Sequence, residues 1–151
     1  MRRHFTFAAV LAAGALAVGA TSARSARADE AEIRATLNRY FSGKADVMAT
    51  AFAPGANMTY VRDSMIITPI PQFIERIREG ERRAAGSKES SQTRPEPEKR
   101  ITSVDIAGNA AIARLDTKRP DMLVVDYMTL LKVNGQWLIV NKSFDRLPIK
   151  Q

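Results

Sequence analysis

Apolar residues recur at helical spacing in three stretches of the first half of the chain. The helices predicted from this spacing cover residues 29–41, 46–52 and 71–80. Between the second and third helices, residues 57–68 alternate between apolar and polar side chains, which predicts a pair of strands broken at Asp63-Ser64. Residues 79–98 carry many charges and few apolar side chains, so we expect a solvated loop there.

From residue 99 onward the pattern changes to the alternation of β-strands. Gly108-Asn109 and Asn134-Gly135 each separate two alternating apolar runs, and Asn-Gly at such a point is a strong signal for a hairpin turn. The strands predicted in this half cover residues 101–107, 110–117, 122–133 and 136–146. The chain therefore predicts an α+β domain in which the helices come first and an antiparallel sheet follows.

A two-residue turn at Asn134-Gly135 would fix the register of the last hairpin. The opposed pairs are then Val133 with Gln136, Asp126 with Ser143, and Tyr127 with Lys142. One face would carry Asp126, Met128, Trp137, Ile139, Asn141 and Ser143. The other face would carry Tyr127, Leu131, Val140, Lys142 and Phe144. Because both faces are apolar, we expect the first to cover the helices and the second to be buried in a homodimer.

The first 28 residues read as a cleavable signal peptide. Arg2 and Arg3 precede an uncharged apolar run over residues 5–20, which is short for a membrane anchor. Ala26-Arg27-Ala28 is a small-x-small triplet, and we expect cleavage after Ala28. The mature protein would be a single domain over residues 29–151, periplasmic or secreted, exported by the general secretory route or the twin-arginine route.

Removing this peptide changes the charge argument, because the whole chain has 23 basic and 16 acidic residues. The mature chain keeps 19 basic and 16 acidic residues, a net charge of +3, so the composition gives no basic face for nucleic acid and no membrane association after cleavage. The chain has no Cys, and its single His4 lies in the signal peptide. Zinc, copper and haem sites are therefore disfavoured, and we expect no cofactor.

The order of elements resembles the nuclear transport factor 2-like (SnoaL-like) superfamily, and within it the putative lumazine-binding family. Three segments carry this resemblance: EIRATLNRYF (32–41), SVDIAGNAAI (103–112) and DYMTLLKVNGQWLIVNKSF (126–144). The resemblance implies a strongly curved, mostly antiparallel sheet wrapped around three helices as a cone. In that fold the Trp and Ile of a Gly-x-Trp-x-Ile pattern point into the cone, which would place Trp137 and Ile139 inside.

The polar residues expected inside the cone are the candidates for chemistry. A carboxylate in an apolar cavity has its pKa raised, so Asp126 could serve as a base or as a neutral hydrogen-bond donor. Tyr40 on the first helix resembles the oxyanion donor of ketosteroid-isomerase-like members, and Tyr60 could close the rim. The candidate ligand-binding set is Tyr40, Tyr60, Asp126, Met128, Trp137, Asn141 and Ser143.

Each of these residues also has a purely structural interpretation. Asp126 could simply accept hydrogen bonds from Asn141 or Ser143, while Tyr40, Trp137 and Met128 could be core residues. Three classes of function follow: a module that binds a small apolar or aromatic molecule, a cofactor-independent isomerase or dehydratase with Asp126 as base, and a structural dimerisation module. The binding module is favoured, since it needs only a cavity and one or two polar anchors.

Overall fold

The computed structural model describes residues 14–86 and 95–149, with side chains described from residue 24 onward. Its centre is a six-stranded sheet in the order β2-β1-β6-β5-β4-β3, in which only β1 and β6 run parallel. The strands are β1 (Phe52–Val61), β2 (Met65–Pro69), β3 (Glu98–Ala107), β4 (Ala110–Lys118), β5 (Met122–Val133) and β6 (Gln136–Pro148). The edge strands β2 and β3 do not pair with each other, so the sheet is open.

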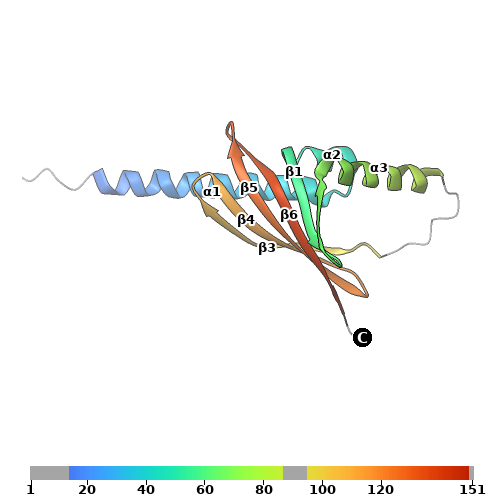
Figure 1. Cartoon of the computed structure of the whole chain (residues 1–151). Helices are drawn as coiled ribbons and strands as arrows, with labels where there is room; N and C mark the ends of the chain where they lie inside the picture. The colour runs from blue at the N-terminus through green and yellow to red at the C-terminus, as the bar shows by residue number, and fades with distance from the viewer. Residues whose placement is uncertain (1–13, 87–94, 150–151) are drawn as a thin grey trace, which may run out of the picture.

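Three helices occupy the N-terminal half: α1 (Gly14–Phe41), α2 (Ala45–Ala49) and α3 (Ile70–Gly86). Figure 1 shows α1 crossing the long strands, while α2 and α3 lie at the end of the sheet where β1 begins. Ile33 and Leu37 of α1 are fully buried against the sheet. The expected α+β fold, with helices preceding four long antiparallel strands, is confirmed.

The C-terminal ends of the second and third helices differ from those predicted. The second helix ends at Ala49, because Phe52 already belongs to β1 and aligns with Ile139 of β6. The third helix continues past Gly80 to Gly86, and ion pairs of Glu75 with Arg78 and Arg82 stabilise its polar surface. Residues 81–86 of the predicted loop are therefore helical, while residues 87–94 of that loop lie outside the described residues.

The N-terminal residues bear on the predicted signal peptide. Residues 1–13 lie outside the described part of the chain. Helix α1 includes the predicted cleavage point after Ala28, and residues 24–28 are exposed on it. Within residues 14–86 and 95–149, no helix has the length and apolar character needed to cross a membrane.

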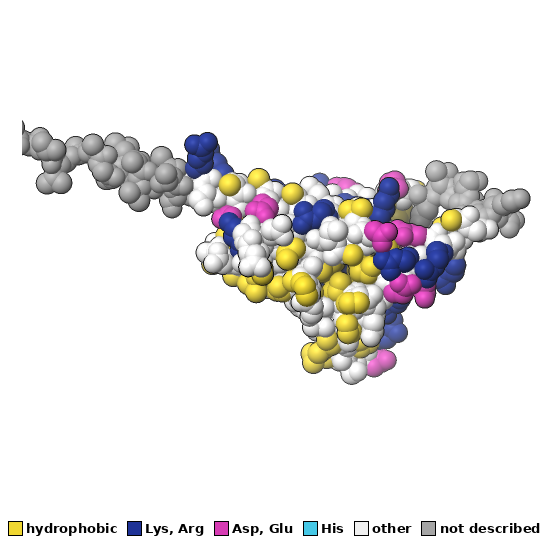
Figure 2. Space-filling model, turned by 90° about the horizontal axis from the view of Figure 1, so that it is seen from above, with side chains coloured by type: hydrophobic (Ala, Val, Ile, Leu, Met, Phe, Trp, Pro, Cys, Tyr) yellow, Lys and Arg dark blue, Asp and Glu magenta, His cyan; other side chains and the backbone are white. Residues whose placement is uncertain are grey.

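The hydrophobic core lies between α1, α2, α3 and one face of the sheet, which we call the inner face. Its largest fully buried apolar side chains are Trp137, Ile33, Leu37, Leu115, Met128, Leu130 and Ile139. The opposite face, which we call the outer face, carries Tyr127 and Ile112, which are 55% and 58% exposed. In Figure 2 apolar side chains form a band across the body of the molecule, and charges of both signs mingle toward the α3 end.

The turn between β5 and β6 has the predicted form. Asn134 and Gly135 both have positive φ, 51° and 81°, as a two-residue turn of this kind requires. The register near the turn is also as predicted, with Val133 opposite Gln136 and Leu131 opposite Leu138.

Beyond that point the predicted register is wrong, because β6 contains a β-bulge. The pairing passes from Leu130–Ile139 to Thr129–Asn141, so Val140 is an extra residue on β6. Asp126 therefore aligns with Phe144 instead of Ser143, and Tyr127 aligns with Ser143 instead of Lys142. Every side chain of β6 after the bulge changes face relative to the prediction.

The main consequence is that Lys142 lies on the inner face beside Asp126. The two residues are 4% and 2% exposed, and the Lys142 ammonium donates to Asp126 Oδ1. A carboxylate removed from water needs a cation or hydrogen-bond donors. The bulge turns the Lys142 ammonium toward Asp126 and so supplies the cation. The expectation that Lys142 lies on the dimer face is wrong for this reason.

We expect Lys142→Met to lower the free energy of unfolding by about 3 to 5 kcal/mol, because it leaves Asp126 buried without its cation. The double substitution Lys142→Met, Asp126→Asn should recover at least half of that loss, because neither charge remains. Urea denaturation of the single and double variants measures this coupling.

Arg114→Met is the matched control, since it breaks a half-exposed pair with Asp116 and should lower the free energy of unfolding far less than Lys142→Met does. A double variant that is no more stable than Lys142→Met would show that the two charges are not coupled in the folded protein.

Candidate functional site

Three polar groups from distant parts of the chain meet on the inner face, and we call them the Tyr40–Asp126–Lys142 cluster. Tyr40 comes from the last turn of α1, Asp126 from the middle of β5 and Lys142 from β6 just after the bulge. The Tyr40 hydroxyl donates to Asp126 Oδ2 at 2.8 Å, and the Lys142 ammonium donates to Asp126 Oδ1. Both carboxylate oxygens of Asp126 are therefore engaged.

The surroundings of the cluster change the acidity of two of its members. Burial lowers the pKa of Lys142 below its ordinary value, although the Asp126 charge opposes this shift. Burial raises the pKa of Tyr40 well above 10, and the negative charge of Asp126 adds to the effect. Tyr40 is therefore a neutral hydrogen-bond donor at any physiological pH.

Aromatic rings surround the ammonium of this cluster. The Lys142 Nζ lies 4.0 Å from the centroid of the Phe144 ring, within the range of a cation–π contact. The ring of Tyr60 lies against Phe144, with centroids 4.9 Å apart. Tyr60, predicted at the rim, is thus linked to the cluster through Phe144, and Phe144 lies on the inner face instead of the predicted dimer face.

Asn141 and Ser143 were expected beside Asp126, and the structure places them on the outer face. Asn141 donates to Ser143 Oγ at 3.1 Å and accepts from the Thr59 hydroxyl at 3.2 Å. The bulge at Val140 is the physical cause, because it reverses the alternation for both residues. Neither residue is a partner of Asp126.

Met128 and Trp137 lie inside, as predicted, and both are almost fully buried. The Trp137 indole donates to Asp29 Oδ1 at 3.0 Å, and the same carboxylate oxygen accepts from the Lys132 ammonium at 2.6 Å. Hydrogen bonds to Lys132 and Trp137 lower the pKa of Asp29. Trp137 therefore ties the start of the predicted mature chain to the sheet.

Lys142 is the residue that the sequence analysis missed. The sequence did contain a signal for its inner position. A carboxylate predicted inside an apolar cone requires a cationic partner, and Lys142 is the basic residue nearest to Asp126 across the hairpin. A single extra residue in β6 suffices to bring that cation to the inner face.

A hollow of about 400 Å³ opens at the end of the sheet where β1 begins, between β1 and α3. Between Phe52–Ile139 and Asn57–Asn141, β1 uses more residues than β6, so the stretch around Pro54 and Gly55 bends out of the ladder. Gly55 has a φ of 77°, which a side chain disfavours. The walls are mostly apolar: Ala49, Phe52, Ala53, Pro54, Gly55, Ile70, Pro71, Ile74 and Arg78.

The hollow adjoins the polar cluster through one aromatic contact. Phe52 forms one wall, and its ring meets the Tyr40 ring edge to face, with centroids 6.1 Å apart. Phe52 thus separates the hollow from the hydroxyl that binds Asp126.

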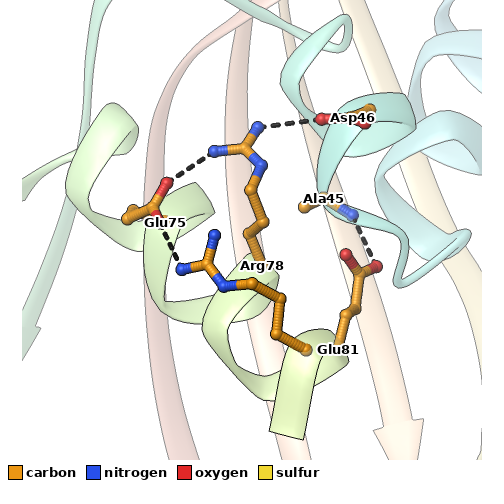
Figure 3. Close-up of polar contacts among 6 residues, drawn as sticks. Ala45, Asp46, Glu75, Arg78 and Glu81 are labelled. Carbon is orange, nitrogen blue, oxygen red and sulfur yellow. Dashed lines mark hydrogen bonds and ion pairs between the residues drawn. The ribbon is translucent and has the colours of Figure 1, made fainter. Parts of the chain in front are cut away.

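Polar contacts join α2 to α3, as Figure 3 shows. The Arg78 guanidinium donates to Asp46 of α2 at 2.8 Å and to Glu75 of α3 at 2.6 Å. Glu81 of α3 accepts from the backbone N–H of Ala45 at 3.0 Å. Arg78 is the only charged side chain that the described residues contribute to the wall, and two carboxylates already pair with it.

Across residues 14–86 and 95–149, no group of three or more His, Cys, Asp or Glu side chains is arranged to hold a metal ion.

Comparison with known proteins identifies the fold. An NTF2-like protein of unknown function from Shewanella baltica is 28% identical, and the match covers 80% of this chain and 95% of that chain with a TM-score of 0.64. Another from Methylobacillus flagellatus is 27% identical, covering 79% of this chain and 92% of that one with a TM-score of 0.60. A third from Silicibacter pomeroyi is 18% identical, covering 81% and 98% with a TM-score of 0.64.

No protein with a curated description matches this sequence. The protein family described as "Putative lumazine-binding" matches residues 28–145, which is most of the chain. With its NTF2-like structural relatives, this match establishes that the chain belongs to the "Putative lumazine-binding" family of NTF2-like proteins.

Proposed function

We propose that this protein is an exported module that binds a small apolar or aromatic molecule on the inner side of the sheet, in the hollow between α3 and the bent stretch of β1. The observation that carries this proposal is the hollow of about 400 Å³ with mostly apolar walls. Cavities of this size and character are typical sites for small organic ligands.

The charges around the hollow favour a neutral ligand. Arg78 lies in the wall, but Asp46 and Glu75 already hold its guanidinium. A negatively charged ligand would have to compete with both carboxylates for the same donors. Lumazine, which the description of the family names, is a compact aromatic molecule of the class that such a hollow accepts.

The Tyr40–Asp126–Lys142 cluster fixes the far wall of the hollow. Because Tyr40 is bonded to Asp126, its ring is held against Phe52, and Phe52 in turn forms the wall. A preorganised wall lowers the entropic cost of binding a rigid ligand.

The same geometry gives less support to an isomerase or dehydratase with Asp126 as base. Both carboxylate oxygens already accept hydrogen bonds, from Tyr40 and from Lys142. A substrate proton could be taken only after one of these donors moved away.

We expect the purified protein to bind the neutral dye N-phenyl-1-naphthylamine, with a rise in dye fluorescence, and lumazine to displace it. Ala53→Trp should weaken dye binding at least tenfold, or about 1.4 kcal/mol, because Ala53 lines the hollow and an indole would fill it. Fluorescence titration measures both affinities.

Ala107→Trp is the matched control, since Ala107 is exposed beside the β3–β4 turn and away from the hollow. Equal dye affinity in the Ala53 and Ala107 variants would place the ligand elsewhere, and a protein that binds neither dye nor lumazine would contradict the proposal.

We also infer that two copies of the chain associate through the outer face over β4, β5 and β6. Ile112, Tyr127, Leu131 and Val133 are exposed there, at 58%, 55%, 40% and 42%. Contiguous apolar area of this kind on a small domain indicates an interface. The face differs from the one predicted by the loss of Lys142 and Phe144, which lie on the inner face.

In light scattering coupled to size-exclusion chromatography, we expect the wild type to elute as a dimer at micromolar concentration. Leu131→Glu combined with Ile112→Glu should give a monomer, because two buried carboxylates per chain would then face each other. Val47→Glu on α2 is the control and should stay dimeric. A monomeric wild type would refute the interface.

The signal-peptide pattern of residues 1–28 supports export. The residues expected at the peptidase, Ala26-Arg27-Ala28, are exposed on α1. Asp29 is the first residue of the predicted mature chain, and its side chain is bonded to Lys132 and Trp137. Cleavage after Ala28 would thus leave the contacts of the folded domain in place.

We expect N-terminal sequencing of the exported protein from its host to begin at Asp29. A chain that begins before Arg24 or after Ile33 would contradict this cleavage point. Replacing Ala28 with Asp is the matched variant, and it should leave the precursor uncleaved because the peptidase requires a small residue there.

A further inference from the structure

An amine and a carboxyl group are held in contact on the inner face, and neither lines the hollow beside α3. The Lys142 ammonium donates to Asp126 Oδ1, and both side chains are almost fully buried. A nitrogen bonded to Oδ1 is one atom away from Cγ, so it is already close to the separation of about 3 to 3.5 Å at which reacting atoms are poised. The pair is therefore arranged for attack of Lys142 Nζ on Asp126 Cγ.

Apolar side chains close the space around this pair. Met58 and Met128 are aligned with Lys142 on the two neighbouring strands, and both are almost fully buried. The Phe144 ring lies 4.0 Å from Nζ. Such surroundings destabilise two charges relative to a neutral amine and a neutral acid. They also exclude the water that would reverse the formation of an amide.

The proton needed for this change lies between the two groups. Burial lowers the pKa of Lys142, which brings the neutral amine within reach. Transfer of one proton from Nζ to Oδ1 along their hydrogen bond converts the ion pair into an amine and a carboxylic acid. A desolvated lysine amine is a good nucleophile, and a carboxylic acid is a far better electrophile than a carboxylate.

Tyr40 contacts the other oxygen of the same carboxyl group. Its hydroxyl donates to Asp126 Oδ2 at 2.8 Å. When Nζ adds to Cγ, negative charge develops on Oδ2, and a donor already in place stabilises that charge. Because burial raises the pKa of Tyr40 well above its ordinary value, the phenol keeps its proton and remains a donor.

We propose that Lys142 and Asp126 condense to an intramolecular amide bond that joins β6 to β5. The Nζ–Cγ bond forms and the Cγ–Oδ1 bond breaks. Oδ1 leaves with two protons of the ammonium as one water molecule, and the amide nitrogen keeps the third proton. The reaction consumes no oxidant, reductant or other reactant. Because the chain has no Cys, this bond gives it a covalent cross-link that a disulfide cannot provide.

A second ion pair has the contact without the surroundings. The Lys132 ammonium lies 2.6 Å from Asp29 Oδ1. These side chains are 28% and 16% exposed, against 4% and 3% for Lys142 and Asp126. Water therefore solvates both charges, and we expect no amide between Lys132 and Asp29.

The test is the intact mass of the purified protein, followed over several days at neutral pH. The mass should fall below the value calculated for the chain by one water molecule. Trypsin should then release one branched peptide that joins residues 119–132 to residues 133–146, because an acylated Lys142 is no longer a cleavage site. This peptide identifies the bond independently of any variant.

Three variants separate the parts of the proposal. Lys142→Arg keeps the positive charge but cannot form the bond, so its mass should equal the calculated value. Tyr40→Phe keeps the ring and removes the donor, so the bond should form about 100-fold more slowly. Lys132→Arg is the matched control and should lose water as the wild type does. Thermal melting checks that each variant is folded.

A folded wild type whose mass stays at the calculated value would overturn the proposal. A loss of water that persists in Lys142→Arg would also overturn it, because the water would then come from another residue. An unchanged rate in Tyr40→Phe would contradict the role of the Tyr40 hydroxyl. Since the ion pair is the reactant, Lys142→Arg is the uncross-linked reference for the unfolding experiments on this pair.

Discussion

A carboxylate and an ammonium share the inner face of the sheet, and much of the structure is arranged so that this pair can exist. Asp126 and Lys142 are both almost completely buried, and an isolated charge in that position would be strongly destabilising. The pair requires the extra residue in β6, because regular alternation after Ile139 would turn Lys142 outward. It also orients Tyr40, since the phenol completes the hydrogen bonding of Asp126. The end of α1 is thereby fixed over the sheet.

The position of α1 decides where open space is left. At one end of its packed segment, Glu32 and Thr36 bond the backbone of Trp137 on β6. At the other end, the Tyr40 ring rests on Phe52 at the beginning of β1. Two hollows lie beside these two contacts, a polar one between α1 and the start of β6 and the apolar one beside α3. Their difference in character follows from their linings, because α1 contributes Glu32 and Arg39 to the polar hollow, whereas α2, β1 and α3 line the apolar one.

The sequence predicted the larger features of the fold because each depends on local signals. Asn134-Gly135 predicted the turn, and the helical spacing of apolar residues predicted the helix over 29–41, in which Ile33 and Leu37 are fully buried. The register near that turn put Trp137, Ile139 and Met128 on one face, and the resemblance to the nuclear transport factor 2-like superfamily implied that this face points inward. The polar site could be predicted only in part. Asp126 and Tyr40 were singled out, but whether they approached each other depended on tertiary packing.

The side chains of β6 that were assigned to the wrong face share one physical origin. A bulge adds a residue without any glycine, proline or change of composition to mark it, and Val140 is an ordinary strand residue. Asn141, Ser143, Lys142 and Phe144 were therefore all assigned to the wrong face by a single shift. A strict count of alternation is reliable near a turn, where the geometry is fixed, and less so with distance from it.

The edge strand β3 limits how the sheet can be extended. Glu98, Lys99, Arg100 and Asp105 are exposed along it, and its pairing with β4 is interrupted between Ile101 and Ser103. Charged side chains and bulges at a sheet edge oppose the addition of a foreign strand, which is the first step of edge-to-edge aggregation. A protein with exposed apolar surface on one face of its sheet thus carries, at the β3 border, a barrier to polymerising into a continuous sheet.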